Sequence, residues 1–179
     1  MTIETVKFKL IQGDITKEKT DVIVNAANPT LRGGGGVDGA IHKAGGPTIL
    51  KECVEKYPDG CNTGEARITT AGLMNAKWVI HTPGPIWRGG YQEEENLLKN
   101  SYLNCIMLAN EYGAKSIAFP SISTGVYGFP VEKASKIAIQ AVIKAVKGTS
   151  IEKIHFVLFS SSDYNIYVEA LKEVSNIRD

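Results

Sequence analysis

The chain has 179 residues, of which 43% are apolar, and its 20 basic and 19 acidic side chains leave a formal net charge of +1. This length and apolar fraction suit one domain spanning residues 1–179, because two domains would each lack buried surface. The balanced, scattered charge argues against a large contact with nucleic acid or an anionic membrane. A small anionic ligand is still compatible with it, since backbone amides supply local positive potential.

The cysteines and the absence of long apolar segments indicate a cellular location. The N-terminal residues include no apolar stretch of signal-peptide length, and no segment approaches a membrane span. Cys53, Cys61 and Cys105 form an odd set without a C-x-x-C pair, which is typical of a reduced chain. The histidines are dispersed, which does not favour a metal site. We expect a cytoplasmic protein without a metal and, as nothing resembles a coiled coil, a monomer.

Short apolar runs alternate with helix-length periodic segments along the chain. In chain order we expect strands at 6–12 and 21–26, helices at about 37–44 and 47–55, strands at 66–71 and 77–82, a helix at about 93–112, a strand at 116–120, a helix at about 131–146, a strand at 153–159 and a helix at about 164–174. The final β-α-β-α order predicts a parallel sheet covered by helices. Runs such as VIV and FVLF are apolar on both strand faces. The fold class is therefore α/β with three layers, and ligands should bind beyond the carboxyl ends of the strands.

Four consecutive glycines, Gly33 to Gly36, follow the second expected strand and precede a helix. Without a Cβ the backbone can wrap around a ligand and point several N–H groups at it, although glycine is costly in folding entropy. The helix adds unpaired amides and the positive end of its dipole. These features favour a cradle for an anion such as a diphosphate. The alternative is a flexible surface loop.

The same loop satisfies the pattern G-x-G-x-x-G through Gly34, Gly36 and Gly39. In a dinucleotide-binding unit this pattern follows its strand directly, in a tight turn. Here eight residues, 26–33, separate the strand from the first matching glycine, so the context argues against that unit. A nucleotide-triphosphate P-loop fits less well, because no Gly-Lys-Ser/Thr follows.

A second loop rich in small residues, SISTGVYGFP, follows the expected strand at 116–120. Its hydroxyls and amides lie near the start of another helix. Two such loops in one short chain favour a clamp that holds a diphosphate from both sides, whereas the alternative is an ordinary strand-to-helix connection. Phe129 in this loop is either core filler, the default for an aromatic residue, or a ring that lies against a sugar or base.

Three polar residues near these loops have both a structural and a functional interpretation. Asp14, after the first strand, either caps a turn or accepts a hydrogen bond from an adenine amine. Asn28 precedes a proline, which is a common turn pair. Asp38 lies at an expected helix N-cap. A carboxylate beside a diphosphate is nevertheless unfavourable unless it orients a ribose hydroxyl or a water, which favours a functional interpretation of Asp38.

The segments GDIT, VIVNAAN, GGGGVDGAIH, IHTPGP and STGVYGFP, in this order and spacing, resemble the macro domain family and most closely its MacroD-type hydrolase branch. The resemblance spans residues 6–167 and implies a mixed, roughly six-stranded sheet between helical layers, with a cleft for ADP-ribose. Three positions depart from the branch. Arg32 replaces an apolar residue and could alter which macromolecule is accepted, Gly45 replaces alanine, and Pro83 replaces a β-branched residue.

The resemblance also implies a role for each motif residue. The adenine would be bordered by Asp14, the Ile15 amide, Asp163 and Tyr164. One side of the diphosphate would be held by Gly34, Gly35, Gly36 and Val37, and the other side by Ser123, Thr124, Gly125, Val126 and Tyr127. Phe129 would pack on the distal ribose. Asn28 and Asp38 would recognise that ribose and carry out catalysis.

The favoured hypothesis is a hydrolase that removes mono-ADP-ribose from acidic side chains of proteins and deacetylates O-acetyl-ADP-ribose. Asp38 would orient or activate water or hold a ribose hydroxyl, while Asn28 would hold the sugar. No metal or redox cofactor is needed. The alternative is a reader module that binds ADP-ribose without cleaving it, and such a module needs neither residue. A third hypothesis, regulation of RNA metabolism through surface contacts, has no support from the charge.

Overall fold

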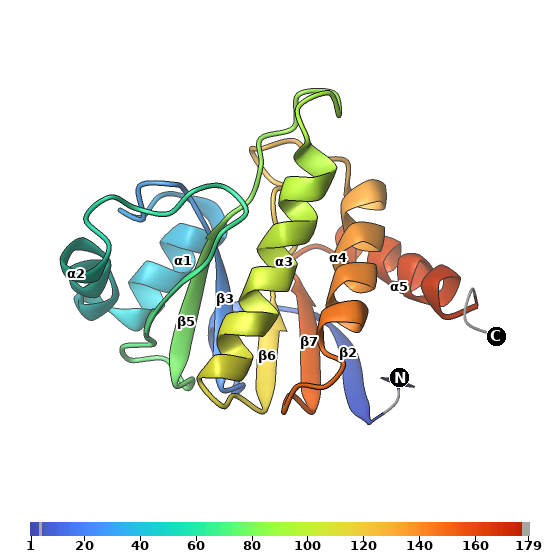
Figure 1. Cartoon of the computed structure of the whole chain (residues 1–179), viewed down its shortest axis with the longest axis horizontal. Helices are drawn as coiled ribbons and strands as arrows, with labels where there is room; N and C mark the ends of the chain where they lie inside the picture. Colours follow the sequence, from blue (N-terminus) through green and yellow to red (C-terminus); the bar gives the residue numbers. More distant parts are fainter. Residues whose placement is uncertain (4, 177–179) are drawn as a thin grey trace.

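The computed structural model describes residues 1–3 and 5–176 and has a seven-stranded sheet between two layers of helices (Figure 1). The strand order is β1-β2-β7-β6-β3-β5-β4. Five strands form a parallel centre: β2 (Val6–Gln12), β7 (Lys153–Leu158), β6 (Ser116–Phe119), β3 (Val22–Ala27) and β5 (Trp78–Pro83). The two edge strands, β1 (Thr2–Ile3) and β4 (Arg67–Thr70), run antiparallel to their neighbours. The predicted mixed α/β sheet is confirmed.

The helices divide between the two faces of this sheet (Figure 1). One face is covered by α3 (Glu94–Glu111), α4 (Val131–Ala145) and α5 (Ser161–Asn176). The other face is covered by α1 (Gly36–Gly45) and α2 (Pro47–Lys56), with a short 3-10 helix, η1 (Ile15–Lys17), after β2. The three-layer arrangement therefore matches the sequence prediction.

Strand β3 shows why the central strands have continuous apolar sequences. Val22, Ile23 and Val24 are all fully buried. Val22 and Val24 belong to the core under the three helices, whereas Ile23 belongs to the core under the two helices. Successive side chains of a strand point to opposite faces, so a strand covered on both faces needs apolar residues throughout.

The structure differs from the prediction by one additional strand and by the ends of some elements. The seventh strand, β1, has two residues, which is too short to show a period in the sequence. Helix α5 begins at Ser161 instead of 164, because the Ser160 hydroxyl accepts a hydrogen bond from the Asp163 N–H and caps the helix start. Strand β4 spans four residues instead of six.

Cys53, Cys61 and Cys105 are free and buried. Burial raises the pKa of the Cys53 and Cys61 thiols to about 11, so both thiols are protonated at neutral pH. Over residues 1–3 and 5–176, no helix combines the length and apolar character needed to cross a membrane.

Candidate functional site

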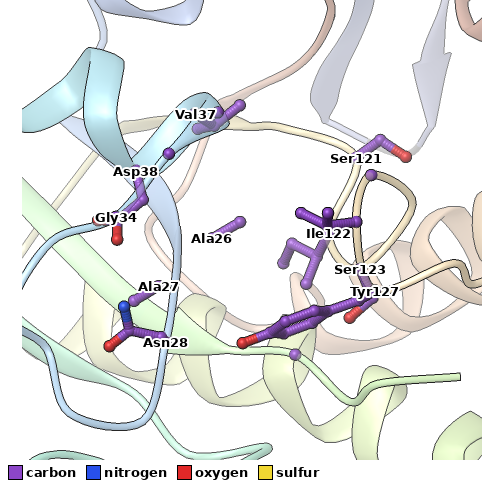
Figure 2. A pocket seen from close by; sticks show the side chains of 15 residues that line it. Ala26, Ala27, Asn28, Gly34, Val37, Asp38, Ser121, Ile122, Ser123 and Tyr127 are labelled. Atoms are coloured by element: carbon purple, nitrogen blue, oxygen red, sulfur yellow. The ribbon is translucent and has the colours of Figure 1, made fainter.

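Two adjoining cavities lie beyond the carboxyl ends of the parallel strands. The central cavity has a volume of about 270 Å³ and is lined by residues 26–28, 34–38, 121–123, 125–127 and Gly84 (Figure 2). The β2-side cavity has a volume of about 490 Å³ and is lined by residues 13–15, 36–37, 40, 120–121, 124–125, 157–159 and 163. Gly36, Val37, Ser121 and Gly125 line both. The two cavities therefore form one continuous cleft where ligands of such sheets bind.

The first glycine-rich loop brings its backbone against two polar side chains. A Cβ on Gly34 would lie 3.0 Å from Asp38 Oδ2 and 3.4 Å from Asn28 Nδ2. Gly33 and Gly36 have φ angles of 84° and 56°, which residues other than glycine rarely adopt. A flexible surface loop would not need its backbone so close to Asp38 and Asn28. The geometry therefore favours the interpretation of this loop as a cradle for an anion.

Helix α1 begins at Gly36 with Gly35 as its N-cap, so the predicted N-cap role of Asp38 is wrong. Asp38 lies in the first helical turn, where the positive end of the helix dipole stabilises a carboxylate. The residue is 5% exposed, and its Oδ1 accepts a hydrogen bond of 2.8 Å from Asn25 Nδ2. His42 Nε2 lies 3.3 Å from the same oxygen. The other oxygen, Oδ2, faces Gly34 on the cavity wall.

A buried polar network supports Asp38 from behind. The register of β3 and β5 pairs Asn25 with His81, and Asn25 Nδ2 lies 3.1 Å from His81 Nδ1. Burial lowers the pKa of His81 to about 4, so this ring is neutral at neutral pH. Because Nδ1 accepts from Asn25, Nε2 carries the proton and donates to Thr69 Oγ1 at 2.9 Å. The Thr69 hydroxyl donates onward to the Thr70 carbonyl, while the buried Asn25 Oδ1 has no hydrogen-bond partner among the described residues.

Asn28 is fixed by its own loop. Its Nδ2 donates to the Gly33 carbonyl at 2.6 Å, and its Oδ1 accepts from the Thr30 hydroxyl. Figure 2 shows the Tyr127 hydroxyl pointing towards Asn28 across the central cavity. One N–H of the Asn28 amide is left over after the bond to Gly33 and is available to a ligand.

Two buried tyrosines anchor the second glycine-rich loop. Tyr102 Oη accepts from the Ile122 N–H at 3.1 Å and donates to the Pro120 carbonyl at 3.3 Å. Tyr167 Oη donates to Ser121 Oγ at 3.0 Å. These bonds reach the loop from the core under the three helices.

Ser123 is the strained residue of this second loop. Its φ of 67° is unusual for a residue with a side chain. Its Oγ is buried and has no hydrogen-bond partner among the described residues, yet Ser123 lines the central cavity. A Cβ on Gly84 would collide with this hydroxyl, so Gly84 allows the chain after β5 to approach the loop. An unpaired buried hydroxyl on a cavity wall can bind a ligand without losing a protein partner.

Most of the predicted site residues meet in the cleft. The central cavity is lined by Asn28, Gly34, Gly35, Gly36, Val37, Asp38, Ser123, Gly125, Val126 and Tyr127. The β2-side cavity is lined by Asp14, Ile15, Thr124 and Asp163, with Gly36, Val37 and Gly125 shared. Residues that are distant in sequence thus lie together, as the strand-end rule predicts.

Phe129 and Tyr164 line neither cavity, so the ligand contacts predicted for them stay predictions. Phe129 is 1% exposed and packs on Trp87, with ring centroids 4.6 Å apart. Tyr164 packs against the core under the three helices. Both side chains take the packing role that is the default for aromatic residues.

Asp14 has the structural role that the sequence left open. It is the N-cap of η1, and its Oδ1 accepts from the Thr16 N–H at 2.9 Å and from the Thr16 hydroxyl at 2.7 Å. The hydrogen bond from the Thr16 hydroxyl lowers the pKa of Asp14, so the carboxylate is ionised at neutral pH. It also lines the β2-side cavity, and its contact with adenine stays a prediction.

The sequence reasoning missed Asn25, His42 and His81. His42 had a signal, because a residue four positions after Asp38 shares its helix face. Asn25 and His81 had none, since their contact depends on the pairing of β3 with β5. Over residues 1–3 and 5–176, no cluster of three or more His, Cys, Asp or Glu side chains is placed to hold a metal ion.

Two of the unusual residues have structural explanations. Arg32 donates to the Pro58 carbonyl at 3.2 Å and to the Tyr57 carbonyl at 3.4 Å, just beyond the end of α2. A cation is favourable there, at the negative end of the helix dipole. A Cβ on Gly45 would lie 3.2 Å from the Ala71 carbonyl oxygen and would displace the end of the Ile49 side chain, so glycine fits this space better than alanine.

Comparison with known proteins gives consistent matches. Residues 24–138 match the family model described as the macro domain. A macro domain-containing protein of Caldanaerobacter subterraneus is 55% identical over 94% of this chain and 97% of its own length. An O-acetyl-ADP-ribose deacetylase of Pantoea vagans is 47% identical over 92% of this chain and 98% of its own. A solved variant of the Oceanobacillus iheyensis macrodomain with ADPR has a TM-score of 0.93 and 44% identity, over 98% of this chain and 97% of that one.

Proposed function

The chain belongs to the macro domain family, and we propose that it is a MacroD-type hydrolase that binds ADP-ribose. Its substrates would be O-acetyl-ADP-ribose and proteins carrying mono-ADP-ribose on acidic side chains. The relative named as a deacetylase supports the first substrate. The protein substrate carries the same kind of bond, an ester on the distal ribose. The cytoplasmic location and the monomeric state stay predictions from the composition.

One observation carries the proposal: Asp38 Oδ2 and the Asn28 amide meet beside Gly34 on the wall of a cleft built from two glycine-rich loops. The loop amides suit a diphosphate, and the α1 N-terminus adds a favourable potential. The adenosine would then occupy the β2-side cavity with Asp14, and the distal ribose would lie at Asn28. A module that only binds ADP-ribose has no need for a buried carboxylate held in one orientation.

In the reaction, water hydrolyses the ester bond between the distal ribose and the acyl group. Its oxygen joins either the acyl carbon or the anomeric carbon, and the products are ADP-ribose and a carboxylic acid. Asp38 Oδ2 would orient the water or accept its proton, while Oδ1 stays bound to Asn25. Asn28 would hold the sugar, and the clamped diphosphate would make the attack a positioned event.

The direct test incubates the protein with glutamate-linked mono-ADP-ribosyl protein and with O-acetyl-ADP-ribose, and follows release of ADP-ribose. We expect release from both substrates. The variant Asp38→Ala should lower kcat by about 10²–10⁴, the usual contribution of a positioned general base. Calorimetry should show that this variant still binds ADP-ribose, and that wild type binds ADP-ribose more tightly than NAD or ATP.

Three results would each contradict a different part of the proposal. Binding of ADP-ribose without release, at enzyme in excess over substrate, would make the protein a reader module. Full turnover by Asp38→Ala would remove the catalytic assignment while leaving the hydrolase assignment in place. NAD binding as tightly as ADP-ribose would favour a dinucleotide site instead.

A further inference from the structure

A third cavity adjoins the central cavity on the side away from the β2-side cavity. This β5-side cavity has a volume of about 240 Å³ and includes Thr63, Arg88 and Gln92 in its lining. It shares Gly84 and Tyr127 with the central cavity. None of its lining residues belongs to the β2-side cavity. The three cavities therefore follow one another in a row, with the central cavity in the middle.

This order gives the third cavity a position on the substrate. The proposed function places the adenosine in the β2-side cavity and the distal ribose at Asn28. Asn28 lines the central cavity, and the next residue, Pro29, lines the β5-side cavity. The Tyr127 hydroxyl, which points towards Asn28, belongs to a residue of both cavities (Figure 2). A group attached to the distal ribose would thus leave the central cavity at the entrance of the β5-side cavity.

The wall of this cavity is held in place before any ligand binds. Glu94 is 2% exposed, and its carboxylate accepts hydrogen bonds from the N–H groups of Arg88 at 2.8 Å, Gly90 at 3.2 Å and Gln92 at 2.6 Å. The Trp87 N–H donates to the Tyr127 carbonyl at 2.8 Å, which joins this wall to the second glycine-rich loop. Such fixed walls reduce the ordering cost of binding.

Size and chemistry then indicate the occupant. About eight waters fill 240 Å³ at roughly 30 Å³ each, whereas an acetyl group has only three heavy atoms. The cavity is therefore oversized for O-acetyl-ADP-ribose and suits a peptide. The Glu94 oxygens are engaged by backbone amides, while the Arg88 side chain is exposed and forms no ion pair among the described residues. The available charge is thus positive.

We propose that the β5-side cavity binds the polypeptide that carries the ADP-ribose, and that Arg88 selects acidic residues next to the modified side chain. This inference rests on the proposed function, because it takes the orientation of the ADP-ribose from it. Ile86 in the lining is exposed, and the exposed side chain of Tyr91, on the same loop, extends the contact surface beyond the cavity.

The test compares substrates that differ only beyond the distal ribose. Kd is measured for free ADP-ribose and for glutamate-linked ADP-ribosyl peptides with acidic or neutral flanks, in an Asp38→Ala background that prevents cleavage. We expect the acidic peptide to bind about tenfold more tightly than ADP-ribose. Arg88→Gln should weaken binding of the acidic peptide by about three- to fivefold, which is the size expected for an exposed ion pair. Because salt screens such a pair, this loss should be smaller at high salt. Affinity for free ADP-ribose should be unchanged.

Two further variants separate charge from space. Thr63→Phe fills the cavity and should weaken binding of both peptides without changing that of ADP-ribose. Lys153→Gln removes an exposed charge at the amino end of β7, whereas the cleft lies beyond the carboxyl ends of the parallel strands, and should change nothing. In kinetic form, Arg88→Gln should raise KM for the acidic peptide and leave O-acetyl-ADP-ribose turnover within about twofold.

The outcomes are decisive in either direction. Equal affinity for the peptides and for free ADP-ribose overturns the subsite, as does an equal loss of both affinities in Arg88→Gln. Equal affinity for acidic and neutral peptides overturns the selection by Arg88. The binding measurement needs no turnover, so it remains valid if the protein proves to be a reader. Failure of the hydrolase proposal is therefore distinguishable from failure of this one.

Discussion

The two glycine-rich loops face the same cleft, but different parts of the protein support them. Behind the first loop lies a polar network in which Asn25 connects Asp38 to His81. Behind the second loop lies an aromatic core. From this core, Tyr102 accepts a hydrogen bond from the Ile122 N–H, and Tyr167 donates one to the Ser121 hydroxyl. The proposed reacting group is on the polar side, and the second loop offers only amides and hydroxyls.

This difference suggests a division of labour. A carboxylate that must stay charged and oriented needs donors around it, which an apolar core cannot supply. A loop that only clamps a diphosphate needs rigidity, which buried aromatic side chains provide. Changes behind the first loop should therefore lower kcat, whereas changes in the second loop should weaken binding.

Among the residues that support the loops, the largest effect is expected at Asn25, which touches Asp38 without lining the cleft. Asn25→Ala removes the donor to Asp38 Oδ1, and we expect kcat to fall about a hundredfold because a misplaced base loses most of its contribution. Kd for ADP-ribose, measured by calorimetry, should change less than threefold. A matching loss in Kd would show that the network supports the whole cleft rather than Asp38.

A charged substitution at the same position sharpens this test. Asn25→Asp places a second carboxylate beside Asp38, and like charges raise the pKa of the pair. The acidic limb of the kcat–pH profile should therefore move to higher pH. An acidic limb that does not move would mean that ionisation of Asp38 does not set it.

The second prediction concerns acid and the neutral His81 ring. Its pKa in the folded protein is about 4, below the ordinary 6.5, because the ring is buried. Above pH 6.5 the ring is neutral in both states and contributes no pH dependence. Between pH 6.5 and 4 the unfolded chain binds a proton that the folded protein does not, so stability falls by about 3 kcal/mol.

Urea unfolding at several pH values measures this loss. His81→Asn keeps an acceptor for Asn25 and cannot take up a proton, so its stability should fall less than that of wild type over the same range. If the free energy of unfolding falls equally with pH in both proteins, His81 is not the source of the acid sensitivity.

Two neighbouring glycines of the first loop provide the third comparison. Gly34→Ala would put its methyl 3.0 Å from Asp38 Oδ2, so we expect kcat to fall about tenfold through a small displacement of the base. A Cβ on Gly35 has nothing within 4 Å and would project into open space. Gly35→Ala should raise KM by crowding the ligand, with kcat unchanged. Steady-state kinetics distinguish the two, and identical behaviour would mean that Gly34 does not position Asp38.

The sequence predicted the supports less well than the loops themselves. Strand β2 matches the predicted residues 6–12, and the two loops follow predicted strands, so local patterns sufficed to bring Asn28 and Asp38 into one cleft. Local patterns did not reveal the contact between Asn25 and His81, which are 56 residues apart. That contact depends on which strands are neighbours and in which register.

Exposure was the other property that the sequence did not provide. The motif gave Phe129 a ligand contact, but tertiary packing places its ring against Trp87 in the core. In contrast, Ser123 was predicted at the diphosphate and does line the cavity, although nothing in its type indicated the left-handed backbone. Residue identity limits the roles a side chain can take, and the packing of neighbouring elements selects among them.

The smallest effect is expected at Ser123, which tests the clamping side of the comparison. Ser123→Ala removes a hydroxyl that has no protein partner among the described residues, so stability should not fall. If the hydroxyl binds the diphosphate, affinity for ADP-ribose should drop about fivefold, the worth of one hydrogen bond, with kcat unchanged. Ser123→Gly should lose the same affinity. The stability of Ser123→Gly should stay close to that of Ser123→Ala. Glycine relieves the strain of the left-handed backbone, about 1 kcal/mol, but its greater loss of conformational entropy on folding offsets this gain. A change in kcat for either variant would mean that the second loop also positions the reacting groups.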